Sequence, residues 1–155
     1  MLRWCLGSLV FAACCAPLLG LTVARAHAQT MTASDFQRVG EFFDGQERLG
    51  SRTVLRTQPE WRPGCYFVVA LEGGATAWPE GVTAVLEVIP AGAVEPMEFA
   101  FTRPAQNLRG NSIWIGVTGS DWPGPRVQPL AWRVRWVGPN EQMVGEWTSF
   151  LWERA

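Results

Sequence analysis

The chain lacks most of the side chains on which enzymes depend. It has 155 residues but one histidine, His27, and three of its four cysteines, Cys5, Cys14 and Cys15, lie in the same N-terminal region. Histidine is the commonest general base and metal ligand, so the remaining sequence cannot assemble most hydrolase or metalloenzyme sites. We therefore expect a protein without catalytic activity, metal or cofactor.

The charged residues are also unusual in type. Lysine is absent, and all 13 basic residues are arginine. Loss of Arg3 and Arg25 with the N-terminal region leaves 11 arginines against 14 acidic residues, a mild net negative charge. Binding to a phosphate backbone depends on clustered positive charge, so we expect no nucleic-acid partner.

The first 28 residues have the pattern of a secretory signal. Arg3 lies in a short n-region, an apolar run follows from Leu6 to Val23, and Ala26-His27-Ala28 has the A-x-A form of a cleavage site. We expect cleavage after Ala28. The protein is then exported to the periplasm or the cell exterior, and residues 29–155 form a single domain.

Other interpretations of this segment stay open. The apolar run approaches the roughly 18 residues that suggest a membrane anchor, and Cys14 is a candidate for lipid modification. Beyond residue 28 only Cys65 remains, so no internal disulfide is expected despite an oxidising compartment. Cys65 lies in an apolar run, where cysteine usually acts as a small buried hydrophobe, and we favour that role over a reactive thiol.

Short alternating runs separated by glycine and proline predict an all-β fold. Alternation predicts that Trp132, Val134 and Trp136 face the core, with Arg133 and Arg135 on the opposite face. Two sheets packed in this way would form an antiparallel sandwich of seven or eight strands. The seven runs expected to be strands are residues 52–57, 65–72, 82–89, 96–102, 112–118, 130–137 and 143–152.

One segment is ambiguous. Within residues 32–50, Ser34 followed by Gln37 resembles a helical capping box, and Phe36 begins a helical spacing of apolar residues that Gly40 interrupts. The alternative is an eighth strand near residues 38–43. We favour the strand.

The number of predicted strands resembles that of a known architecture. Seven or eight short strands end in a hairpin at Gly138-Pro139-Asn140-Glu141, where Pro139 suits a type I turn. This pattern resembles the immunoglobulin-like or fibronectin-like sandwiches of exported bacterial proteins. Cys65 has no partner and the next predicted strand lacks tryptophan, so the resemblance implies architecture and transfers no functional residues.

Three tryptophans stand directly before or near a proline in turn-like segments: Trp61, Trp78 and Trp122. Proline stiffens such loops, which favours the presentation of an aromatic ring. In an immunoglobulin-like topology the loops of Trp61 and Trp122 emerge at one end of the sandwich and Trp78 lies at the other. Trp61 and Trp122 are therefore a candidate binding surface for a sugar ring or a protein. The alternative is that they plug the end of the sandwich.

The remaining candidates are charged. Arg133 and Arg135 have the chemistry to clamp an anionic ligand, although we favour their pairing across strands with acids such as Glu146. Glu95 with Glu98 is the kind of carboxylate pair that an unfamiliar glycosidase would need. The interpretation we favour is a non-catalytic exported domain that binds another envelope protein or has a structural role there. The alternative is a small carbohydrate-binding or ligand-binding module.

Overall fold

The structure is a computed structural model that describes residues 22–36, 52–72, 77–78, 80–102, 106–107 and 112–154. Over these ranges the chain consists mainly of β-strands, which form two four-stranded sheets and one two-stranded sheet. The all-β prediction is confirmed. Among the described residues, no helix is both long and apolar enough to cross a membrane.

The first sheet has the strand order β1-β3-β8-β2. These strands are β1 (Val23–Met31), β3 (Gly64–Leu71), β8 (Ser112–Thr118) and β2 (Arg52–Arg56). Both β1 and β8 run antiparallel to β3. The edge strand β2 runs parallel to β8, which corrects the prediction of a purely antiparallel sandwich.

The parallel pair follows from a short connection. Residues 57–63 reverse the chain between β2 and β3, and β8 lies between these two strands. Because β8 is antiparallel to β3, β2 must run in the same direction as β8. The connection is fixed against β8: the backbone N–H of Thr57 donates to the carbonyl of Gly116 at 2.9 Å, and that of Gln58 donates to Thr118 Oγ1 at 3.2 Å.

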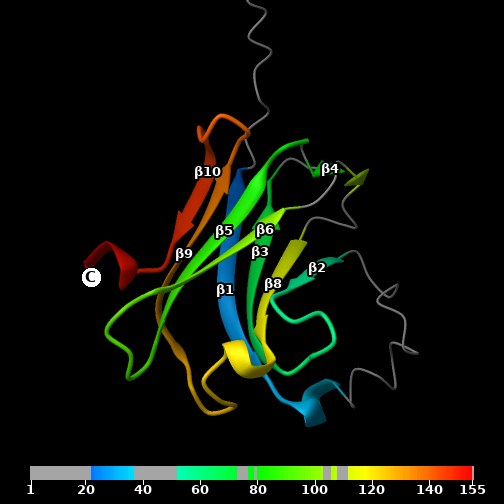
Figure 1. Cartoon of the computed structure of the whole chain (residues 1–155). Coiled ribbons are helices and arrows are strands. Elements are labelled where there is room, and N and C mark those ends of the chain that lie inside the picture. Colours follow the sequence, from blue (N-terminus) through cyan, green and yellow to red (C-terminus); the bar gives the residue numbers. More distant parts are fainter. Residues whose placement is uncertain are drawn as a thin grey trace, which may run out of the picture.

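The second sheet has the order β10-β9-β5-β6 and is antiparallel throughout. Its strands are β10 (Met143–Thr148), β9 (Pro129–Val137), β5 (Thr83–Pro90) and β6 (Met97–Thr102). The two four-stranded sheets lie face to face as two layers (Figure 1). The small third sheet pairs β4 (Ala77–Trp78) with β7 (Gln106–Asn107), and two 3-10 turns, η1 (Gly119–Asp121) and η2 (Trp152–Arg154), follow β8 and β10.

The core lies between the two layers and is filled by every second residue of the central strands. The predicted inward face of β9 is confirmed, because Trp132, Val134 and Trp136 are all buried. Cys65 is also buried in this cluster, in the role favoured from the sequence. The cluster also includes, from β3, β8 and β5, the residues Phe67, Val69, Ile113, Ile115, Val117, Leu86 and Val88. Burial of this apolar surface is the principal force that holds the layers together.

All seven predicted strands are present, most of them within one residue at each end. The last is the exception, because β10 ends at Thr148 and not at residue 152. Ser149 ends the strand: its N–H donates to the carbonyl of Trp132 at 2.8 Å and its hydroxyl accepts from the Trp132 N–H at 2.9 Å. The chain then turns, and the N–H of Trp152 donates to the carbonyl of Ser149.

The hairpin between β9 and β10 closes where the sequence predicts. The N–H of Glu141 donates to the carbonyl of Gly138 at 3.0 Å, which is the hydrogen bond of a four-residue turn. Glu141 itself has a φ of 59°, in the left-handed region. A residue in this conformation after such a turn matches the strand twist of a hairpin, and glycine is the residue that adopts it at least cost.

The outer face of the first sheet is partly covered near the start of the ambiguous segment. Residues 33–36 form a helical turn. Its cap is Thr32, two residues earlier than predicted, because the N–H and hydroxyl of Thr32 donate to Asp35 Oδ2 at 2.8 and 2.7 Å. Phe36 packs on Tyr66 of β3, with ring centroids 5.8 Å apart. The predicted strand near residues 38–43 lies outside the described residues.

Candidate functional site

Trp122 is buried, with 5% of its surface exposed, so the predicted pair of exposed tryptophans is wrong. After β8 the chain tightens into η1, and the N–H of Trp122 donates to the carbonyl of Gly119. This turn directs the indole into the core, where it forms part of the buried cluster. Trp122 therefore closes the end of the sandwich, which is the alternative that the sequence left open.

Trp61 remains at the surface, with 56% of its area exposed. Its loop does meet the η1 loop, because the N–H of Gly119 donates to the carbonyl of Pro63. Gly119 has a φ of +60°, and a side chain there would meet Trp61 Cγ at 3.2 Å. Glycine at this position thus permits Trp61 to lie close to the η1 backbone. Trp78 is buried, and its Nε1 donates to the carbonyl of Val82 at 2.8 Å.

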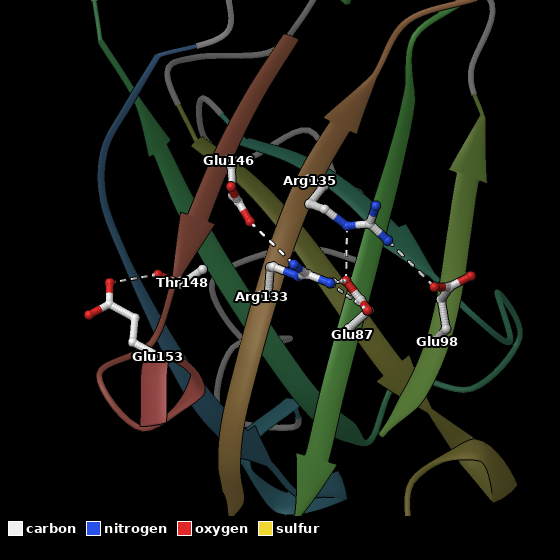
Figure 2. A network of polar contacts seen from close by, with 7 residues as sticks. All are labelled: Glu87, Glu98, Arg133, Arg135, Glu146, Thr148 and Glu153. Atoms are coloured by element: carbon white, nitrogen blue, oxygen red, sulfur yellow. Dashed lines mark hydrogen bonds and ion pairs between the residues drawn. The ribbon is translucent and has the colours of Figure 1, made fainter. Parts of the chain in front are cut away.

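Arg133 and Arg135 lie on the outer face of β9, as predicted, and both contact Glu87 of β5 (Figure 2). Arg133 Nε and Nη2 donate to the two carboxylate oxygens of Glu87 at 2.7 and 2.8 Å. Arg135 Nε donates to Glu87 Oε2 at 2.9 Å. Longer ion pairs join Arg133 to Glu146 at 3.6 Å and Arg135 to Glu98 at 3.5 Å.

The electrostatics of this cluster favour ionised side chains. Partial burial of Glu87 opposes its ionisation, but hydrogen bonds and charges from Arg133 and Arg135 outweigh that effect and hold the pKa of Glu87 below its usual value. The hydrogen bond to Glu87 raises the pKa of Arg133. The cross-strand pairing favoured from the sequence is therefore present, and the two guanidinium groups are directed at carboxylates of their own sheet.

Cys65 lacks the setting of a reactive thiol. It is fully buried, and burial raises its pKa to about 12, against a smaller opposing effect of a hydrogen bond with Thr30. A thiol of this kind carries almost no thiolate at neutral pH, and thiolate is the nucleophilic form. No cluster of histidine, cysteine or acidic residues that could hold a metal ion occurs among the described residues.

A groove opens between the free sides of β2 and β6, and the sequence alone did not indicate it. Its volume is about 480 Å³. The lining combines apolar side chains of both sheets with one arginine and comprises Val54, Leu55, Arg56, Pro59, Ala100, Phe101 and Thr102. Within the described residues, β2 pairs only with β8 and β6 only with β5, so each strand lies at the edge of its sheet. Both runs were predicted as strands, but a strand pattern does not reveal which strands lie at an edge.

Comparisons of the chain with protein-family models, with curated protein sequences and with solved structures found no significant match.

Proposed function

We propose that this protein is an exported, non-catalytic binding domain that holds an extended segment of another envelope protein in the groove between β2 and β6. The observation that carries this proposal is a groove with Leu55 and Phe101 in its lining, bordered by two sheet edges. The N-terminal apolar run supports export. The absence of histidine beyond residue 27 supports a role without acid–base chemistry.

The backbone of an edge strand is a ready template for another strand. In β6 every second residue directs its N–H and C=O away from β5, because hydrogen bonds to one neighbour use only half of these groups. An extended peptide can pair with them and place alternate side chains into the groove. The main-chain bonds would supply affinity, and the groove would select the side chains.

The lining defines the chemistry of the bound segment. Leu55 and Phe101 contribute to the core and also border the groove, so part of its lining is apolar. Arg56 in the lining donates through its Nε to the hydroxyl of Tyr66 at 2.9 Å, and the arginines of the nearby outer face contact Glu87. We therefore expect a segment that places apolar side chains at alternate positions against Leu55 and Phe101, where burial of apolar area supplies affinity.

The strand order supports an immunoglobulin-like or fibronectin-like architecture for the domain. The order β10-β9-β5-β6 corresponds to strands G, F, C and C′ of such a sandwich, and β1-β3-β8 corresponds to A, B and E. The position of strand D is taken by β2, which precedes β3 in the chain and runs parallel to β8. That departure is what brings β2 to the edge opposite β6.

Selection of random displayed peptides on the purified protein tests the proposal. Selected peptides should alternate apolar and polar residues and should lose at least about tenfold in affinity for Ala100→Glu, since a charged side chain on an edge strand opposes the addition of another strand. Met143→Glu is the matched control, because Met143 is 53% exposed on β10, the opposite edge of the same sheet. Equal binding to both variants would contradict the proposal.

Trp61 favours a second candidate function, carbohydrate binding. The Trp61 indole has 56% of its surface exposed, on a loop held by the hydrogen bond from the Gly119 N–H to the Pro63 carbonyl. Such an indole can stack on a sugar ring. The test is a panel of bacterial polysaccharides presented to the protein and to Trp61→Ala. Binding that is lost in Trp61→Ala but kept in Ala100→Glu would favour this function over the groove.

A further inference from the structure

We propose that strand β1 remains part of the mature protein, so that the chain is not cut after Ala28. The predicted cleavage site Ala26-His27-Ala28 lies inside β1 (Val23–Met31), the strand that completes the first sheet beside β3 (Figure 1). Cleavage at that bond would divide the strand. Any removal of the preceding apolar run must therefore occur before Val23.

The contacts of β1 are those of a structural strand. Eight residue pairs join it to β3, from Val23 opposite Leu71 to Met31 opposite Gly64. The N–H of Glu72 donates to the carbonyl of Thr22 at 2.8 Å and extends the pairing by one more bond. A cut after Ala28 would remove five of the eight pairs and expose the edge of β3 over residues 67–71.

The side chains of β1 also cover the core. Val23, Ala26 and Ala28 pack against the buried cluster, whereas Arg25 and His27 are exposed. This is the alternation of a half-buried strand. Small residues two positions apart have the same spacing as the −3 and −1 residues of a peptidase site, so a strand with small inward side chains reproduces the A-x-A pattern. The inward face of a strand thus explains Ala26 and Ala28 without a cleavage site.

The first part of the test is the N-terminus of the exported protein. The full chain with its own N-terminal region is produced in a bacterium with a general secretion pathway, and the isolated protein is analysed by intact mass and N-terminal sequencing. The expected first residue lies at or before Val23, and an uncleaved chain also satisfies the proposal. A protein that begins at Gln29, or at any residue from Ala24 to Ala28, overturns it.

The second part uses substitutions in the same full chain. Val23→Ala should lower the thermal midpoint of the isolated protein by about 3–5 °C, because it removes two methyl groups from a side chain packed on the core. His27→Ala is the matched control on the exposed face and should leave the midpoint unchanged. If the segment is removed during export, both substitutions vanish with it. Isolated proteins of identical mass and midpoint would then overturn the proposal.

Discussion

Replacement of Glu87 by glutamine should destabilise the second sheet through its outer face. Glu87 accepts three hydrogen bonds from Arg133 and Arg135 at 2.7 to 2.9 Å, and its side chain is 12% exposed. Hydrogen bonds to charged groups contribute about 1.5–3 kcal/mol when removed singly. The arginine side chains are 28% and 24% exposed, so solvent screens part of the loss, and we expect Glu87→Gln to cost about 2 kcal/mol in the free energy of unfolding at pH 7.

The stability that Glu87 contributes depends on pH in a direction that can be tested. The pKa of Glu87 is lower in the folded protein than in the unfolded chain. The stabilisation is therefore complete above the unfolded pKa, about 4.3, and is lost as the pH falls through the lower folded pKa. Glutamine has no such titration. The difference between wild type and Glu87→Gln should consequently be constant at neutral pH and shrink as the pH falls below about 4.

Urea unfolding followed by tryptophan fluorescence, at a series of pH values from 7 to about 2.5, measures this difference. The control is Glu98→Gln, because Glu98 has a longer ion pair of 3.5 Å with Arg135 and is 62% exposed. We expect Glu98→Gln to cost less than about 0.5 kcal/mol. Equal costs for the two variants, or a Glu87→Gln cost that stays constant into acid, would refute the reasoning.

Three further outcomes follow from the structure. Cys65 is fully buried and has a pKa of about 12, so it should resist iodoacetamide at pH 8 in the native protein and react in urea. Mass spectrometry of its peptide measures the labelling, and fast labelling of the native protein would contradict this expectation. Glu141→Gly should raise stability by roughly 0.5–1 kcal/mol, since φ is 59° at this residue, and an unchanged or lower urea midpoint would contradict that strain. Trp122→Ala should cost about 3–5 kcal/mol by urea unfolding, whereas Trp61→Ala should cost less than about 1; similar costs would show that Trp122 is not a core residue.

The strands could be predicted because their information is local. Alternation along residues 130–137 separates Trp132 and Trp136 from Arg133 and Arg135, and the structure buries the first pair and pairs the second with Glu87. The turn at Gly138 was equally local. Such patterns depend only on the period of a strand and on the backbone preferences of proline and glycine.

The candidate site was harder to predict from the sequence, because it depends on the topology of the strands. Whether Trp122 points outward is decided by the η1 turn and the space beneath it, and neither is encoded in a Trp-Pro pair. The groove needs β2 and β6 at facing edges, which results from the connection over β8. In the N-terminal region, the spacing of Ala26 and Ala28 fits both a signal-peptidase site and the inward face of a strand. The peptidase site was the prediction made from the sequence, and β1 was therefore not predicted.

Site-specific photo-crosslinking in the protein's own cells tests the central claim most directly. A benzophenone side chain placed at Ala100, beside the groove, should form an adduct with one envelope protein through a segment of alternating apolar residues. The same group at Met143, on the opposite edge of the sheet, should not form that adduct. Adducts of equal yield at both positions, or none at Ala100, would contradict a binding site between β2 and β6.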